Sequence, residues 1–355
     1  MKEVDEFAKT WRMLAPGTPL REGLDNILRA KTGGLIVVSD SPQVMEIVEG
    51  GFIIDTEFTP AALYELGKMD GAIILNSDVT RILRANAHLV PQANIASQET
   101  GIRHRVADRV ARQTGALVIA ISQRRSIITL YQGSHKFVVR ETPFILSKAN
   151  QAIQTLDKYK YVLDKSLNKL SILEFEDIVT VHDVAKVVQR LEMVLRVVRE
   201  IKHYIYQLGT EGRLINLQLE ELTEGTWEAN DLLLKDYYVG EGEKSIEEIS
   251  STLQQYACEE KLDMVSISRL LGYGGALSSL DLPVTPRGYR MLNKLPRLPL
   301  QVIDNLVERF GVLPKIIQAS VQELDEVEGI GEVRAKTIKE GLQKLREQLL
   351  LDPHI

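Results

Sequence analysis

The pattern of apolar residues changes near residue 147, and this change constrains the fold more than any other feature of the sequence. Before it, short apolar runs are bounded by glycine. From Ser147 to about Gly209 the pattern is almost continuously helical and poor in glycine and proline. Short apolar runs between turn residues are typical of buried strands, and a long stretch without breakers favours packed helices. The sequence therefore predicts an α/β domain followed by an all-α region.

Helical and strand patterns are interspersed in the first domain. Apolar side chains recur at helical spacing in residues 4–14 and 20–30, and Thr59-Pro60 opens a further helix through Leu66. The runs that predict strands are residues 35–38, 52–54, 73–75, 81–85, 116–121, 126–131 and 137–139. This arrangement indicates an α/β domain with a central mixed sheet that ends near Phe144.

Apolar residues of the helical stretch recur at heptad-like spacing, which we interpret as plain helix core. They are Ile153, Leu156, Val162, Leu163, Leu167 and Leu170, and later Leu191, Val194, Leu195 and Val198. Gly272–Gly275 and the proline-rich stretch 283–299 mark the next boundary. The predicted domains are therefore 1–146, a helical spacer at 147–290, and 291–355.

Bulk composition narrows the class of protein. A length of 355 residues allows two or three domains, and 44% apolar with 26% charged residues is typical of a soluble globular protein. Apolar runs are strand-sized, the N-terminus lacks the apolar stretch of a signal peptide, and a single cysteine excludes an internal disulfide. We expect a cytoplasmic protein.

Charge is unevenly distributed along the chain. Residues 220–260 hold twelve carboxylates against two lysines, a net −10, so the total of −6 leaves about +4 for the remainder. We interpret the acidic segment as a solvated face or spacer. Net charge alone therefore does not decide whether the chain binds DNA.

The short stretch from Gly101 to Gly115 contains charged residues that could bind a ligand. Valine and alanine recur at helical spacing from 106 to 111, so a helix is expected to start near Gly101 and stop before Gly115, with Asp108 paired to Arg112. Arg103, His104 and Arg105 then occupy its first turn, where free amides already make the helix end positive. A bound phosphate chain would neutralise this positive charge. The alternative is that these are ordinary solvated side chains.

This stretch forms a motif pair with Asp70-Gly71-Ala72, about thirty residues upstream. The pair resembles the motifs of diadenylate cyclase domains. Together with the C-terminal motif described below, the chain is similar over essentially its whole length to the family of bacterial DNA integrity scanning proteins, which make cyclic di-AMP.

The resemblance implies a site for ATP. It assigns the triphosphate to Arg103, His104 and Arg105, and a position beside the adenine to Leu89. Gly71 would let the backbone approach the nucleotide closely. The nucleotide-binding set implied is Asp70, Gly71, Ala72, Leu89, Ile102, Arg103, His104, Arg105, Val106, Ser122 and Arg125. The resemblance further implies an octamer in which cyclase domains meet face to face.

Asp70 is the expected ligand of Mg²⁺ or Mn²⁺ and the activator of the attacking hydroxyl, because these metals prefer oxygen ligands. A plain turn aspartate before glycine is the alternative. In the family the Arg-His-Arg triplet is commonly flanked by threonines. Ile102 and Val106 stand there in this chain, and neither can donate a hydroxyl hydrogen bond.

The last sixty residues contain Gly329-Ile330-Gly331 between two apolar helical patterns. This resembles the helix-hairpin-helix motif, which binds DNA phosphates through the second helix's first amides and nearby cations, here Arg334, Lys336 and Lys339. Residues 332–346 hold five cations and two glutamates. The expected partner is branched DNA such as a Holliday junction. A tight turn that binds nothing is the alternative.

Two other functions remain open from the sequence. One is a structural DNA-binding protein whose nucleotide-binding domain is inactive. The other is an enzyme that makes a different cyclic or linear nucleotide.

Overall fold

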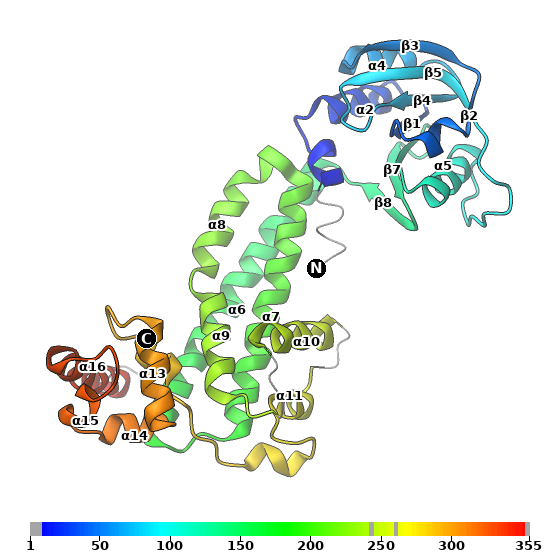
Figure 1. Cartoon of the computed structure of the whole chain (residues 1–355). Coiled ribbons are helices and arrows are strands. Elements are labelled where there is room, and N and C mark those ends of the chain that lie inside the picture. Colours follow the sequence, from blue (N-terminus) through cyan, green and yellow to red (C-terminus); the bar gives the residue numbers. More distant parts are fainter. Residues whose placement is uncertain (1–8, 241–244, 259–261, 352–355) are drawn as a thin grey trace. The chain divides into compact units, whose positions relative to one another are not determined.

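The computed structural model describes residues 9–240, 245–258 and 262–351 (Figure 1). The chain forms two compact units, Met1–Asn150 with Lys202–Asn216, and Gln151–Ile201 with Leu217–Ile355. Of the helix expected at 4–14, residues 9–14 are helical and the rest lies outside the described residues. No helix in the described part of the chain is long and apolar enough to span a membrane. The three-domain division at 146/147 and 290/291 stays a prediction.

The first unit is built on an eight-stranded sheet. Its strands are β1 (Gly34–Val38), β2 (Val48–Glu49), β3 (Phe52–Glu57), β4 (Ala72–Leu75), β5 (Arg81–Leu89), β6 (Leu117–Ser122), β7 (Ile127–Gln132) and β8 (His135–Val139). The order is β2-β5-β4-β1-β6-β7-β8, with β3 also paired to β5. β1 and β4 are parallel, and the other pairs are antiparallel. The predicted mixed sheet is confirmed.

Helices cover both faces of this sheet. They are α2 (Pro19–Arg29), α3 (Pro42–Met45), α4 (Pro60–Leu66) and α5 (Ile102–Thr114). The first three begin with proline after a serine or threonine whose side chain caps the helix. In β1, Ile36 packs with α2 and α4, whereas Val37 packs with α3 and α5, because alternate side chains of a strand point to opposite faces.

Helix α5 follows the sequence closely. It begins after Gly101 and ends at Gly115, whose φ of 71° is the left-handed conformation that favours glycine. Asp108 and Arg112 form the expected ion pair at 2.7 Å. The predicted bounds of this helix are confirmed.

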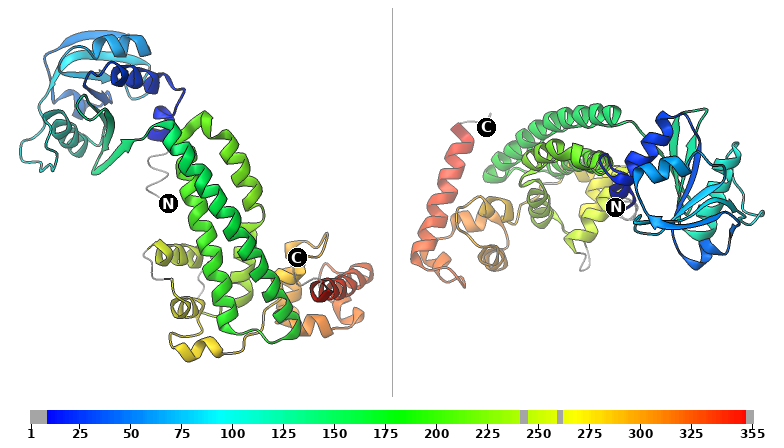
Figure 2. Two further views of the ribbon diagram at one scale, coloured as in Figure 1. Left: turned by 180° about the vertical axis from the view of Figure 1, so that it is seen from behind. Right: turned by 90° about the horizontal axis from the view of Figure 1, so that it is seen from above.

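Helices make up most of the remaining described residues (Figures 1 and 2). The helices are α6 (Thr142–Glu176), α7 (Val181–Leu208), α8 (Arg213–Thr223), α9 (Thr226–Tyr237), α10 (Ile246–Cys258), α11 (Met264–Leu271), α12 (Tyr289–Asn293), α13 (Leu300–Phe310), α14 (Leu313–Gln318), α15 (Val321–Asp325) and α16 (Glu332–Leu351). Most of the predicted heptad positions are buried. Val162 is 42% exposed, so its assignment to the core was wrong, because its neighbour Leu163 takes the buried position.

A buried polar joint holds α12 against α6 and α9. The Asp236 carboxylate accepts the backbone amides of Gly288, Tyr289 and Arg290 at 2.6, 2.8 and 3.0 Å. Arg290 Nη1 donates to Glu174 Oε1 at 2.6 Å, and the Tyr237 hydroxyl donates to the same oxygen at 2.7 Å. Burial, reinforced by Glu174, raises the pKa of Asp236 to about 7. The joint satisfies α12's first amides inside the core.

Helices α12 to α16 share one apolar core. Its buried members include Leu292 and Leu295 from around α12, Ile303 from α13 and Ile338 from α16, and Phe175 of α6 packs against it. The residues before and after the predicted boundary at 290/291 are therefore packed together.

Candidate active site

The strand register explains why the motif residues meet. Parallel pairing aligns Ile36 with Ile73, and antiparallel pairing aligns Gly34 with Ile121. The starts of β1 and β4 and the end of β6 therefore lie at one edge of the sheet. Asp70 and Ser122 occupy this edge, and α5 begins there.

Asp70 and Arg103 are brought together. Arg103 Nη2 donates to Asp70 Oδ1 at 3.2 Å, although the two residues are 33 positions apart in sequence. The Asp70 side chain is 91% exposed. The Gly71 amide first, and then Arg103, hold the pKa of Asp70 below its usual value. The edge therefore carries an ionised, solvent-facing carboxylate beside a guanidinium.

Gly71 is required by the protein's own backbone. Its φ is 83°, and a Cβ there would lie 2.8 Å from the Ala87 carbonyl oxygen. Asn86 next to it donates its side-chain amide to the Asp70 carbonyl at 2.9 Å. The close approach that needs glycine is thus to β5, which fixes the turn that presents Asp70.

Arg103, His104 and Arg105 of the α5 first turn have separate partners within the chain. Arg103 reaches Asp70, His104 Nδ1 lies 2.9 Å from the Tyr131 hydroxyl, and Arg105 Nε donates to the Glu99 carbonyl at 3.2 Å. Successive helix residues are rotated by about 100°, so their three side chains leave in different directions. Arg103 is the one that points to the aspartate.

Beneath His104 lies a polar group that the sequence analysis missed. Tyr131 of β7 is 1% exposed, and its hydroxyl lies beside Glu99, which is ion-paired with Lys136. Burial lowers the pKa of His104, as do the nearby Lys136, Arg125 and Arg103. A tyrosine in a buried strand needs a partner for its hydroxyl, and that was the available signal.

The other predicted nucleotide-binding residues differ in accessibility. Ala72 and Leu89 are buried, and Leu89 packs in the core under α5. Ile102 is 82% exposed, and Val106 is half-buried. The Arg125 amide donates to Ser122 Oγ at 3.2 Å. Leu89 therefore packs in the core, and its expected position beside the adenine stays a prediction.

The donor set at Asp70 suits a cation shared with a nucleotide. In the described residues no group of three or more His, Cys, Asp or Glu side chains is arranged to hold a metal ion. Magnesium is commonly held by one or two carboxylates together with substrate phosphates and water. The exposed Asp70 carboxylate fits this role.

The C-terminal motif forms a turn between α15 and α16. Gly329 has φ 84°, and the buried Ile330 packs in the core of these helices. At Gly331, by contrast, a Cβ would meet nothing within 4 Å. The fold thus requires Gly329 but leaves the space at Gly331 open.

Three predicted DNA-binding cations lie on α16 and have different partners. Arg334 donates to the Gly329 carbonyl, and Lys336 pairs with Glu332 at 2.6 Å. Lys339 Nζ donates to the carbonyls of Ile317 and Ala319 at 2.8 and 2.5 Å. Lys339 therefore stabilises the end of α14, while Arg334 and Lys336 are exposed.

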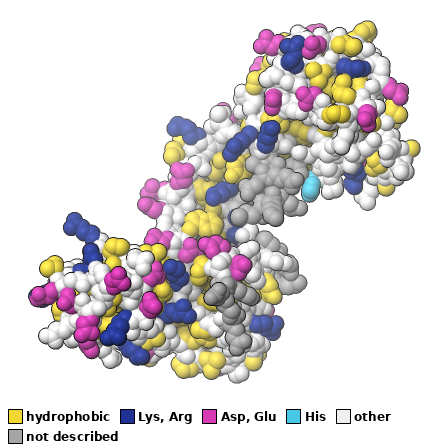
Figure 3. Space-filling model, in the orientation of Figure 1, with side chains coloured by type: hydrophobic (Ala, Val, Ile, Leu, Met, Phe, Trp, Pro, Cys, Tyr) yellow, Lys and Arg dark blue, Asp and Glu magenta, His cyan; other side chains and the backbone are white. Residues whose placement is uncertain are grey.

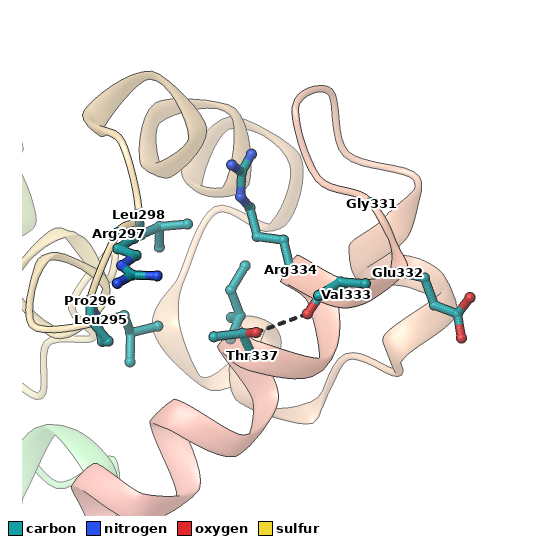
Figure 4. Close-up of a pocket in the computed structure, with 10 residues that line it drawn as sticks. Leu295, Pro296, Arg297, Leu298, Gly331, Glu332, Val333, Arg334 and Thr337 are labelled. Atoms are coloured by element: carbon teal, nitrogen blue, oxygen red, sulfur yellow. Dashed lines mark hydrogen bonds between the residues drawn. The ribbon is translucent and has the colours of Figure 1, made fainter.

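A groove of about 790 Å³ lies beside this turn (Figure 4). Leu295, Arg297 and Leu298 line one side, and Val333 and Arg334 line the other. The side chain of Glu332 points away from it. The groove is thus bordered by two arginines.

Comparisons with known proteins agree with this architecture. Residues 21–136 match the family model described as DisA bacterial checkpoint controller nucleotide-binding, and residues 139–280 match the DisA bacterial checkpoint controller linker region. The fold and these matches define a protein with an α/β nucleotide-binding domain followed by a helical linker region.

Full-length relatives make the assignment specific. The DNA integrity scanning protein DisA of Carboxydothermus hydrogenoformans is 61% identical over 95% of this chain and 96% of its own length. Those of Clostridium botulinum and Acetivibrio thermocellus are 54% and 53% identical, over 98% and 99% of this chain and 98% and 97% of their own lengths. The chain belongs to the family of DNA integrity scanning proteins, as the sequence motifs predicted.

Proposed function

We propose that this chain condenses two ATP molecules into cyclic di-AMP and releases two pyrophosphates. The observation that carries the proposal is the meeting of Asp70 with Arg103 at the start of α5. It sets an acidic group beside a cation where free helix amides already favour phosphate. The match to a nucleotide-binding family model supports the same assignment.

Each bond formation requires the 3′-hydroxyl of one ATP to attack the α-phosphate of the other. Asp70, kept ionised by its lowered pKa, is suited to accept a hydrogen bond from that hydroxyl and to hold Mg²⁺ or Mn²⁺. The metal would neutralise phosphate charge and make the hydroxyl more acidic. Arg103, Arg105 and the first amides of α5 would stabilise the charge that develops on phosphate.

Two cyclase domains must act together in this proposal. The product has two-fold symmetry, and one domain with one such edge holds one ATP, so two domains would face each other across a two-fold interface. We propose, by family resemblance, an octamer in the cytoplasm. An isolated protomer is expected to be inactive.

Mass spectrometry after incubation with ATP or GTP and manganese tests the reaction. We expect cyclic di-AMP from ATP, loss of most of the rate in Asp70→Asn, and full activity in the control Asp78→Asn, an exposed aspartate of the same unit. Undiminished activity of Asp70→Asn would remove its assigned role. A different product, or none, would favour another nucleotide enzyme or a structural DNA-binding protein.

We further propose that the turn at Gly329–Gly331 is a helix-hairpin-helix that binds DNA backbone. The open space at Gly331 supports this, because nothing inside the protein demands glycine there, whereas a phosphate approaching the amides would. Basic and acidic side chains are interspersed on the face seen in Figure 3. Lys336 is ion-paired with Glu332 and Lys339 donates to two backbone carbonyls, so few cations near the turn are available to neutralise phosphates. Binding is therefore expected to be weak, sequence-independent and salt-dependent.

Point variants test DNA binding better than truncation. Cutting after Pro296 would leave Leu292 and Leu295 without the core they share with α13 to α16. Gly331→Ala and Arg334→Glu should weaken the gel shift of a four-way junction, whereas Lys344→Glu, farther along α16 and also exposed, should change it less. Equal effects of all three variants would contradict the hairpin assignment.

A further inference from the structure

The hydroxyl of Tyr131 lies between His104 and the half-buried carboxylate of Glu99. It lies 2.9 Å from His104 Nδ1 and beside Glu99, whose side chain is 16% exposed. Glu99 is also ion-paired with Lys136 of β8. His104 on α5 is thus connected through β7 to the loop before its own helix.

The chemistry of the three side chains decides which of them donates each hydrogen bond. An ionised carboxylate only accepts hydrogen bonds, and a tyrosine hydroxyl has one proton to donate. Although burial raises the pKa of Glu99, the neighbouring Lys136 and Tyr131 lower it overall. Tyr131 therefore donates to Glu99, and its oxygen is left to accept a proton from His104 Nδ1. In a neutral imidazole, Nε2 then carries no proton.

We propose that Tyr131 and Glu99 are positioning residues of the cyclase, which hold His104 in the tautomer protonated at Nδ1 and fix the plane of its ring. Nε2, across the ring from Tyr131, is then offered to the nucleotide as an acceptor, and it becomes a donor to phosphate only after taking up a proton. The inference rests on the proposed function and specifies how one residue of that site is prepared.

A purely structural role for the same contacts makes different predictions. Tyr131 belongs to the core under α5, and Arg105 already ties the Glu99 backbone to the helix. If Tyr131 and Glu99 served stability alone, their loss would lower the melting temperature without changing the tautomer or separating kcat from KM.

Tyr131→Phe keeps the buried ring and removes only the hydroxyl. We expect kcat for cyclic di-AMP to fall roughly 10- to 100-fold, as for the loss of other partners that orient a histidine, while KM for ATP changes little. The matched control is Tyr273→Phe, which removes a hydroxyl that donates to the Tyr237 carbonyl at 2.6 Å in the other unit. Its kcat should remain that of the parent.

Nitrogen-15 solid-state spectra of the histidine-labelled full chain read the tautomer directly. At pH 8, above the ordinary histidine pKa of about 6.5, His104 should carry its proton on Nδ1, with its signals assigned by their absence from His104→Gln. Glu99→Gln provides an amide that can donate to the Tyr131 oxygen. This frees the hydroxyl proton for Nδ1 and should shift the histidine proton toward Nε2, with a matching loss of kcat.

A proton on Nε2 in the parent chain would overturn the proposal. So would a kcat of Tyr131→Phe that falls no further than that of Tyr273→Phe. Failure of the parent to make cyclic di-AMP would instead overturn the proposed function and the positioning role with it, and the product assay identifies that case before any variant is compared.

Discussion

Ile102 and Val106, which flank the Arg-His-Arg triplet, have different surroundings. Ile102 is 82% exposed, whereas Val106 packs against the core under α5. Val106 can be exchanged for threonine with little change of shape, but Ile102 projects a larger apolar side chain at the start of the helix. Both positions lack the hydroxyl that the family resemblance leads us to expect.

The double change Ile102→Thr with Val106→Thr should therefore raise ATP affinity or turnover. A hydrogen bond to a charged group is worth on the order of 1.5 to 3 kcal/mol, or roughly ten- to hundredfold. Rates at subsaturating ATP would measure it, and Ile102→Ala separates relief of crowding from a gained hydroxyl. A double variant no faster than the parent would mean that the apolar side chains at positions 102 and 106 do not limit ATP binding or turnover.

The sequence predicted correctly those features that depend only on neighbouring residues. The glycines at 101 and 115 and the Asp108–Arg112 pair bound α5 because caps and neighbouring turns decide a helix. Contacts between distant segments were not available in the same way. From the sequence, Tyr131 was only a residue of a predicted strand, and Lys339 was only a cation expected to bind DNA. Their partners inside the protein follow from the packing of β7 against α5 and of α14 against α16.

Among the elements, α12 depends on a cap supplied from far along the chain. Its first amides are bound by Asp236 of α9. An asparagine in that place has one acceptor oxygen, and its amide would oppose a backbone N–H. Asp236→Asn should lower the free energy of unfolding by about 1–3 kcal/mol.

Denaturant unfolding followed by circular dichroism would measure this loss. Asp231→Asn, an exposed aspartate of the same helix, is the matched control and should stay within about 0.5 kcal/mol of the parent. Equal stability of the two variants would mean that the cap at α12 is dispensable.

At the scale of the whole molecule, the two proposed activities lie in different units. By family resemblance, we expect branched DNA to lower cyclic di-AMP output. This requires DNA to prefer one of two arrangements of the helical region, with a coupling of roughly 1 to 3 kcal/mol. Steady-state rates with and without a saturating four-way junction would measure it, and an unchanged rate would make the two activities independent.

The polar joint of Asp236, Glu174 and Arg290 has a consequence for how the chain melts. Because α12 to α16 share a core with Phe175 and are held by this joint, we expect them to unfold together with the helices on which they pack. Scanning calorimetry should therefore show two transitions and not three. Arg290→Ala leaves the buried Glu174 carboxylate with the Tyr237 hydroxyl but without its cation, at a cost of about 3–5 kcal/mol, and should lower only one of the two transitions. Thermal unfolding of the C-terminal hairpin would then take place together with unfolding of the entire helical unit, in one cooperative transition.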